Sequence, residues 1–438
     1  MKLLYGLDEK MPVRQQAIYA LQNLIFFLAS SIVLPVVVGR ALGLAQEGVA
    51  EMLQRTFFLC GVITSLQILF GHKYPIYDSI SGLWAGMLIL MAGTALELGK
   101  GAPTLRTDLE SGILISSAVV VLLSLLGFMP KLIKIFTPTV NGIILMLMVL
   151  QLSPNFVKGM TGIYGDNTTL NPKSLFIFFV TVASILFINT RAKGFLQSIS
   201  TLIGTIIGWT LAAILGLTTA RGDAFASIVS LPSFFAWGTP TFDLGVTLTC
   251  VLAALVLISM NYASINGLAE VLGEKLEPDR FSRSMLIHGI GNFLSGIFSV
   301  TPYMPYLSSS GIVLMTRVAS KKPLLLASYA MIVLGLIKPI GVMFSTIPTE
   351  VGYAALIMIF ALIFGQGVRE LQKVKIENRE SFIIGFSVLI GIGVMFLPAD
   401  TFREFPQIAR YILSNGLVDG TLIVILMEHV VLRKRNPN

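Results

Sequence analysis

The feature that most constrains the fold of this chain is a series of fourteen apolar segments, each about long enough to cross a lipid bilayer as a helix. Only 12% of the 438 residues are charged and 55% are hydrophobic, whereas a soluble domain carries about 25% charged residues. A soluble fold of this size cannot bury so large an apolar surface. The sequence therefore predicts an all-α polytopic membrane protein.

The fourteen segments are separated once by a longer polar and aromatic stretch. We expect them at about residues 16–38, 51–71, 74–97, 109–128, 137–153, 173–190, 197–217, 243–269, 284–301, 302–318, 323–345, 349–366, 380–397 and 409–432. Residues 219–242 divide them into seven and seven and include Leu231 to Trp237, a composition typical of an interfacial link rather than of a spanning helix.

The placement of Lys and Arg predicts the orientation. If the N-terminus is cytoplasmic, 21 of the 31 Lys and Arg residues fall in cytoplasmic segments. Cytoplasmic loops carry this excess in membrane proteins. We therefore expect both termini in the cytoplasm, and topology rather than a nucleic-acid partner explains the net charge of +8.

Two short polar stretches interrupt the third and tenth segments with one pattern. Tyr77 to Gly82 and Tyr306 to Gly311 share Tyr, Ser, Ser and Gly at the same spacing, follow a proline and lead into a short apolar run. A second pair, Pro138 to Gly142 and Pro348 to Gly352, opens the fifth and twelfth segments. Each half has an odd number of segments, so the second half enters the membrane from the opposite side. Both pairs therefore predict an inverted repeat. Paired interrupted segments also mark a transporter's binding site.

Serines at these interruptions are candidates for solute binding. Two helices that start inside the membrane direct their N-terminal dipoles at a shared point, which suits a polar, planar or anionic solute. We assign Ser79, Ser308 and Ser309 to the solute. We expect Ser81 and Ser310 to cap the two short helices.

Asp78 is the most informative charged residue, because intramembrane carboxylates are rare and mark ion or proton paths. One interpretation makes it the N-cap of the following helix. The other makes it a titratable group beside the solute that couples transport to protons. The equivalent position in the second stretch is Leu307, so only one half carries the charge.

Polar side chains also occur inside other apolar segments. Asn261 and Tyr262 lie in the eighth segment and Asn23 in the first. They are candidates for contact with the solute or for packing between helices. His288 and Asn292 share one face of the ninth segment, where we expect mainly packing.

Three stretches make the chain resemble the nucleobase–ascorbate transporter family, also called nucleobase–cation symporter 2. Gln22 to Pro35 resembles the first-segment motif of that family, Leu231 to Phe242 its stretch before the eighth segment, and Ser299 to Arg317 its tenth-segment signature. The family includes bacterial uracil, xanthine and urate permeases.

The resemblance implies an architecture of fourteen segments in a 7+7 inverted repeat, with a core domain and a gate domain. Segments 3 and 10 would each be a short strand followed by a half-helix. A homodimer through the gate domain is also implied. The expected bounds are 1–128 and 243–345 for the two parts of the core domain, 129–218 and 346–438 for the gate domain, and 219–242 for the interfacial link.

Three positions depart from the family pattern. Where the family has a Glu in the eighth segment, the best match in this chain is Asn261. The family's Glu or Gln in the tenth segment is replaced by Ser308, and its His in the first segment by Asn23. The chain therefore resembles the divergent purine/pyrimidine permease branch. Ser and Asn can bind the edge of a base through neutral hydrogen bonds. Asp78 is then the candidate for proton coupling.

Together these features predict a secondary active transporter for nucleobases in the bacterial cytoplasmic membrane. The solute would lie between the two half-helices, with Tyr262 or Tyr306 stacked on its ring. The residues that we assign to it are Asn23, Tyr77, Asp78, Ser79, Asn261, Tyr262, Tyr306, Ser308 and Ser309.

Three alternatives differ in chemistry. An anion transporter of the same architecture is less favoured, because neither interrupted stretch contains Lys or Arg. An uncoupled facilitator would need no titratable group. A membrane enzyme would need an activated nucleophile, paired acids or a metal cluster, and the sequence has no such pattern. We therefore expect no metal, no cofactor and no nucleic-acid partner.

Overall fold

The computed structural model describes the chain except for residues 1–2, 98, 163–169, 218–227, 398, 403, 406–412, 414 and 434–438. Residues 219–227 of the expected link and part of the fourteenth expected segment therefore lie outside the described residues.

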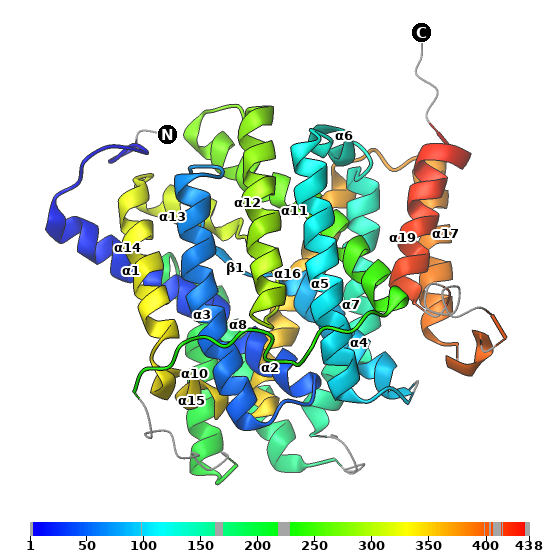
Figure 1. Ribbon diagram of the computed structural model, residues 1–438, viewed down its shortest axis with the longest axis horizontal. Coiled ribbons are helices and arrows are strands. Elements are labelled where there is room, and N and C mark those ends of the chain that lie inside the picture. The colour runs from blue at the N-terminus through cyan, green and yellow to red at the C-terminus, as the bar shows by residue number, and fades with distance from the viewer. Residues whose placement is uncertain are drawn as a thin grey trace.

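Helices make up most of the described chain (Figure 1). They are α1 (Val13–Ser31), α2 (Val33–Ala41), α3 (Gln46–Leu69), α4 (Gly82–Glu97), α5 (Ala102–Leu125), α6 (Met129–Ile133), α7 (Pro138–Thr161), α8 (Pro172–Arg191), α9 (Phe195–Ser198), α10 (Ser200–Ile214), α11 (Leu244–Leu272), α12 (Pro278–Ile297), α13 (Ser308–Thr316), α14 (Lys321–Gly335), α15 (Lys338–Ser345), α16 (Thr349–Gln372), α17 (Asn378–Met395) and α19 (Gly416–Leu426), with a 3-10 turn η1 (Ala399–Phe402) and a π turn η2 (Met427–Val431). Within the described residues, eight helical stretches are long and apolar enough to cross a membrane. The chain is thus a multi-pass helical membrane protein.

Two of the expected spans are broken by proline. Pro35 follows the end of α1 at Ser31, and Pro339 follows the end of α14 at Gly335. A proline clashes with the carbonyl group four residues before it and has no N–H to donate. In both places the preceding helix therefore ends four residues before the proline, and a new helix, α2 or α15, begins shortly after that end.

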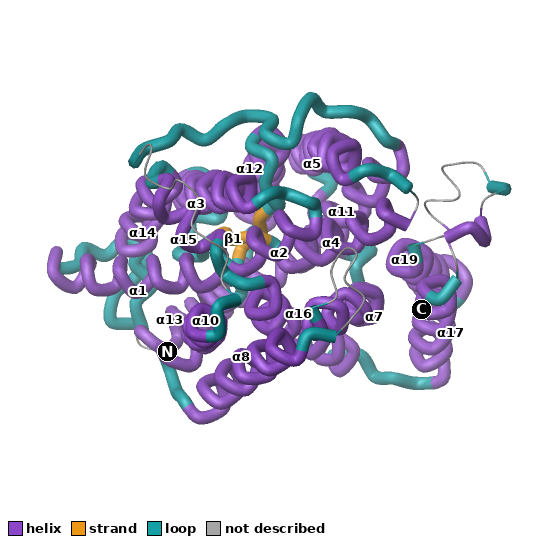
Figure 2. Tube along the Cα trace, turned by 90° about the horizontal axis from the view of Figure 1, so that it is seen from below, coloured by secondary structure: helices purple, strands orange, loops and turns teal. Residues whose placement is uncertain are grey.

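The only sheet in the described part of the chain has two strands, β1 (Asp78–Ile80) and β2 (Tyr303–Pro305). They are antiparallel and pair Asp78 with Pro305 and Ile80 with Tyr303. Each leads into a short helix, α4 or α13, so the expected order of strand and then half-helix is present in both stretches. The strands lie at the centre of the molecule, surrounded by helices (Figure 2). This position satisfies their polar backbone groups away from lipid.

Small residues bring neighbouring helices close together on either side of the strands. A Cβ atom added to Gly335 of α14 would lie 2.4 Å from the Phe58 nitrogen of α3. A Cβ atom added to Gly142 of α7 would lie 2.9 Å from the Gly367 carbonyl oxygen of α16. Such contacts between backbones are typical of helix packing in membranes. They fix α14 on α3 and α16 on α7.

The described part of the link, residues 228–242, has no helix and crosses the lower half of the molecule in Figure 1. The Ser230 N–H donates to the Leu336 carbonyl oxygen at 3.0 Å, and the Phe235 N–H donates to the Ile297 carbonyl oxygen at 2.7 Å. The link is therefore fastened to the ends of α12 and α14. The start of the chain before α1 and the end of α19 lie at the opposite, upper edge.

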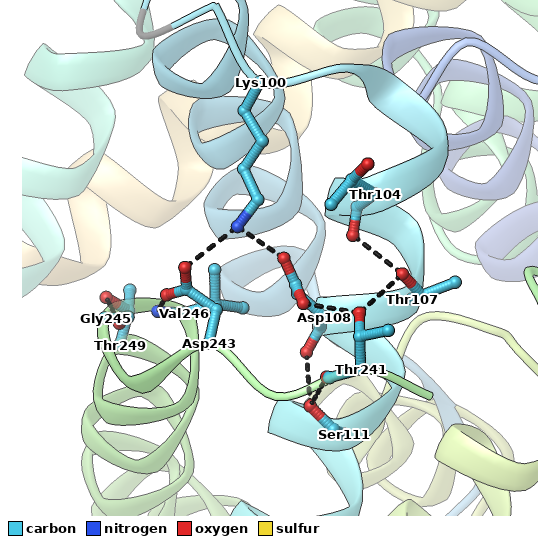
Figure 3. A network of polar contacts seen from close by, with 10 residues as sticks. All are labelled: Lys100, Thr104, Thr107, Asp108, Ser111, Thr241, Asp243, Gly245, Val246 and Thr249. Atoms are coloured by element: carbon cyan, nitrogen blue, oxygen red, sulfur yellow. Dashed lines mark hydrogen bonds and ion pairs between the residues drawn. The ribbon is translucent and has the colours of Figure 1, made fainter. Parts of the chain in front are cut away.

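Lys100, between α4 and α5, holds the end of this link in place (Figure 3). Its ammonium group forms ion pairs with Asp108 of α5 and, at 3.0 Å, with Asp243. Asp243 also accepts the Val246 N–H at 2.9 Å and so caps α11, while Thr241 donates to Asp108 at 2.6 Å. Burial opposes the charge on Asp243, but the hydrogen bonds from Val246 and Lys100 outweigh it and hold the pKa of this carboxyl below its ordinary value.

Candidate functional site

The two interrupted stretches contact each other through their tyrosines and serines. The rings of Tyr77 and Tyr306 stack with centroids 5.2 Å apart and planes inclined by 29°. The Tyr77 hydroxyl lies 2.6 Å from the Ser308 Oγ, and the Tyr77 N–H donates to the Ser309 Oγ at 3.3 Å. The Tyr306 hydroxyl donates to the Ile80 carbonyl oxygen at 2.7 Å. Four residues assigned to the solute from the sequence therefore form one cluster at the start of α13.

Asn23 lies close to this cluster. A small cavity between α1, α13 and the start of α14 is lined by Asn23, Tyr77 and Ser309, together with Gln22 and Thr316. The Asn23 amide donates to the Tyr19 carbonyl oxygen at 2.9 Å, which leaves its side-chain oxygen for another partner. We call this space the α13 cavity.

Ser79 faces a different neighbour from Tyr77, as alternation along a strand requires. The Ser30 hydroxyl of α1 donates to the Ser79 Oγ at 3.0 Å. Ser79 is fully buried and lines neither the α13 cavity nor the larger cavity between α7, α11 and α16. Its side chain therefore joins β1 to α1 in this conformation.

Asp78 is fully buried, and its N–H donates to the Thr64 Oγ1 at 2.9 Å. Neither carboxyl oxygen has a hydrogen-bond partner among the described residues. The first interpretation, an N-cap of α4, is wrong, because the Trp84 N–H of α4 donates instead to the Ser81 Oγ at 3.3 Å. A buried carboxyl group without a partner is costly to keep charged, so Asp78 retains the features of a titratable site.

The capping role expected for the second pair of serines holds in only one stretch. Ser81 caps α4, as expected. Ser310 does not cap α13, because it is the third residue of that helix. Its hydroxyl is buried and has no hydrogen-bond partner in the described chain. Helix α13 begins at Ser308, one turn earlier than the sequence pattern indicated.

Asn261 lies in a buried polar network on α11 rather than at a cavity. Its amide nitrogen lies 3.2 Å from the His288 Nε2, and Asn292 lies 2.9 Å from the same atom. Asn292 in turn accepts the Tyr303 N–H at 2.8 Å. Asn261, His288 and Asn292 therefore support β2, which agrees with the packing role expected for His288 and Asn292.

Tyr262, the next residue on α11, lines a cavity of about 310 Å³ between α11 on one side and α7 and α16 on the other. We call this space the cleft cavity. Its volume is at the lower end of the range for small-molecule sites. Its polar lining residues are Asn141, Ser259, Tyr262, Asn266, Glu270, Gln366, Glu370 and Lys373.

The cleft cavity lies beside the start of α13. Gly267 lines it, and a Cβ atom added to Gly267 would lie 2.8 Å from the Leu307 side chain. Leu307 is 47% exposed, and Ser308 after it is also exposed. The start of α13 thus lies beside the cleft cavity.

The cleft cavity includes residues to which the sequence assigned no role. Asn141 lies in the repeated Pro138 to Gly142 stretch and Asn266 lies on the same helix as Asn261 and Tyr262, but Gln366 gave no signal. No group of three His, Cys, Asp or Glu residues in the described chain could hold a metal ion. The site therefore offers hydrogen bonds and aromatic surfaces rather than metal ligands.

Comparisons with known proteins identify the relatives of this chain. The model of the family described as "Permease family" matches residues 14–400. The Bacillus subtilis protein YwdJ is 31% identical over 424 residues, covering 95% of this chain and 96% of YwdJ. Uric acid permease PucK of B. subtilis is 27% identical over 429 residues, with 97% of each chain covered. The xanthine permease of B. subtilis is 25% identical, covering 94% of this chain and 92% of that protein.

Two solved structures share the fold. SLC26A9 has a TM-score of 0.68 at 14% identity, covering 98% of this chain and 67% of that chain. The transmembrane domain of the cyanobacterial bicarbonate transporter BicA has a TM-score of 0.54 at 16% identity, covering 93% of this chain and 97% of that domain. At these identities the likeness concerns the fold alone.

Proposed function

The chain belongs to the permease family, and we propose that it is a secondary active transporter of purine-type nucleobases in the bacterial cytoplasmic membrane. Membership confirms the predicted family and the prediction that the chain is a permease rather than an enzyme. The observation that carries the proposal is the cluster of Tyr77, Tyr306 and Ser308 beside a cavity, at the point where two half-helices begin. Relatives named for uric acid and xanthine support the substrate class.

In this proposal the solute binds where α4 and α13 begin. Ser308 and Ser309 bind its edge, and Tyr306 or Tyr262 stacks on its ring. Asn23 and Tyr77 close the side facing α1. Ser79, Asp78 and Asn261 surround this point from within the protein, where Asn261 supports β2 and Asp78 is the group that binds the coupling proton.

We propose fourteen segments in a 7+7 inverted repeat with both termini in the cytoplasm. The antiparallel pairing of β1 with β2 supports a two-fold relation between the halves. The start of the chain and the end of α19 lie at the same edge of the molecule, which supports two termini on one side of the membrane. The core and gate domains keep the bounds given above, and we propose a homodimer through the gate domain, as the family resemblance implies.

Alternating access would open the space between the two domains on one side at a time. At the end of the molecule away from the termini, Arg40 of α2 donates to the Thr349 Oγ1 at 2.6 Å and to the Ser345 carbonyl oxygen at 3.0 Å. The cleft cavity lies toward the other end, where Glu370 and Lys373 form part of its wall. We propose that this conformation is closed to the outside and open to the cytoplasm.

Radiolabelled uptake in a bacterial host that lacks its own base permeases tests the proposal. We expect cells that express this chain to take up xanthine, uric acid or uracil at least several-fold faster than cells with an empty vector. Labelled sulfate serves as the control for an anion transporter. Uptake of sulfate without uptake of any base would contradict the proposed function.

A further inference from the structure

The cleft cavity contains two amide side chains, Asn141 and Gln366, whose hydrogen-bonding groups are only partly used by the described residues. Asn141 of α7 and Gln366 of α16 are half-buried and face α11 across this space. They come from the two proposed gate-domain segments, whereas Tyr77, Ser308 and Ser309 come from the proposed core domain. A solute in the cavity would therefore be in contact with both domains.

The hydrogen bonds of Asn141 determine which way its amide points. Its Nδ2 donates to the Phe136 carbonyl oxygen at 3.1 Å and to the Ser259 Oγ at 2.5 Å. A carbonyl oxygen can only accept, so the amide nitrogen must face Phe136, and both of its hydrogens are used. The Oδ1 of Asn141 accepts no hydrogen bond from any described residue. It remains available to accept from an N–H group of a solute.

Gln366 supplies the complementary group. Its amide makes no hydrogen bond to another residue in the described ranges, although it lines the same cavity as Asn141. A free carboxamide presents one donor and one acceptor side by side. Adjacent N–H and C=O groups on the edge of a planar heterocycle match this arrangement.

Aromatic and charged residues complete the cavity. Tyr262 lines it and packs edge-on against Phe281, with ring centroids 5.2 Å apart, which fixes its ring. Among the charged residues of the wall, Lys373 lies 2.6 Å from Glu370, and Glu270 accepts a hydrogen bond from the Asn266 amide at 2.7 Å. The remaining recognition is by neutral hydrogen bonds, which favours an uncharged ring over an anion.

We propose that the cleft cavity is a second, specificity-determining subsite that takes a lactam-bearing heterocycle, whose N–H group donates to Asn141 and whose carbonyl group accepts from Gln366. The inference rests on the proposed nucleobase transport and deepens it. The solute leaves the start of α13 and pauses in this subsite, so the gate domain selects among bases that the core domain admits.

The test is a comparison of KM for xanthine and for its N-methyl derivatives in uptake assays. We expect the native protein to discriminate against at least one derivative, because methylation removes an N–H donor. Asn141→Ala and Gln366→Ala should each raise the KM for xanthine roughly threefold to tenfold, the range for one neutral hydrogen bond. Asn141→Ala should leave the KM for the discriminated derivative nearly unchanged, so the preference is lost. Gln366→Ala should raise both KM values by a similar factor, because the derivative keeps its carbonyl group.

Two controls separate recognition from structure. Gln372→Ala removes an exposed amide from the end of the same helix and should not change either KM. The second control is the Tm of Asn141→Ala and Gln366→Ala, which should stay close to that of the native protein. If Gln372→Ala abolishes the preference as Asn141→Ala does, or if Asn141→Ala lowers the Tm by many degrees, the effect is structural and the subsite is overturned.

The outcomes also distinguish this inference from the proposed function. If the native protein transports xanthine and both amide variants keep its KM and its preference, the subsite is wrong while nucleobase transport stands. If the native protein transports no base, both are overturned.

Discussion

The variant Asp78→Asn is expected to lose proton-driven accumulation of the solute while it still exchanges the solute downhill. Asp78 is fully buried, and neither carboxyl oxygen has a partner among the described residues. An unpaired charge in such a place costs several kcal/mol, so the group would hold a proton in this conformation and release it when the site opens to water. Asn keeps the shape of the neutral acid but cannot release a proton.

Proteoliposomes with an imposed pH gradient measure this effect. One pH unit corresponds to about 1.4 kcal/mol, so a transporter that moves one proton with each solute accumulates it about tenfold. We expect about tenfold accumulation with the native protein and none beyond equilibrium with Asp78→Asn. Asp419→Asn is the matched control, since Asp419 is also a buried carboxyl group but lies in α19, away from the strands.

Two results would contradict the role of Asp78. Undiminished accumulation by Asp78→Asn would place proton coupling elsewhere. If the pH gradient does not change accumulation by the native protein, the chain is an uncoupled facilitator. Asp78 would then have no role in coupling.

A disulfide between Val37→Cys and Gly352→Cys is expected to stop transport. A Cβ atom added to Gly352 of α16 would lie 2.7 Å from the Val37 side chain of α2, so the two cysteines fall within the reach of a disulfide. The Arg40 hydrogen bond to Thr349, the first residue of α16, joins the same two helices. A covalent bond there would hold the proposed outer side closed, and alternating access needs that side to open.

Initial uptake rates before and after reduction measure the effect. We expect the oxidised double variant to lose nearly all uptake, reduction to restore it, and each single variant to stay active in both conditions. The native Cys60 and Cys250 are fully buried and therefore do not compete for oxidation. Normal uptake by fully cross-linked protein would mean that α2 and α16 do not separate during transport.

The arrangement of the two interrupted stretches was predictable because it is encoded locally. The proline, tyrosine and serine spacing around Tyr77 and Tyr306 indicated where each helix stops and restarts, and the structure brings these stretches together as paired strands. The proximity of Asn23, Tyr77 and Ser309 also follows the prediction. The two stretches are related by the repeat, whereas Asn23 was assigned as a polar residue inside an apolar segment and through the family resemblance.

The rotation of α11 was not predictable from the sequence. Asn261 and Tyr262 are adjacent, so about 100° of helix rotation separates them, and only Tyr262 lines a cavity. Hydropathy cannot fix this rotation because α11 is apolar and buried on several sides. Gln366 was missed for a related reason, since a single amide in an apolar helix is also common in packing.

Thermal stability of the purified protein with a panel of ligands tests the central claim, that this chain binds a nucleobase, most directly. A ligand at one hundred times its Kd stabilises the folded state by about 2.7 kcal/mol. We predict that at least one of xanthine, uric acid and uracil raises the Tm by a few degrees in proportion to the logarithm of its concentration, while sulfate does not. A rise in Tm with sulfate and with none of the bases would contradict the account.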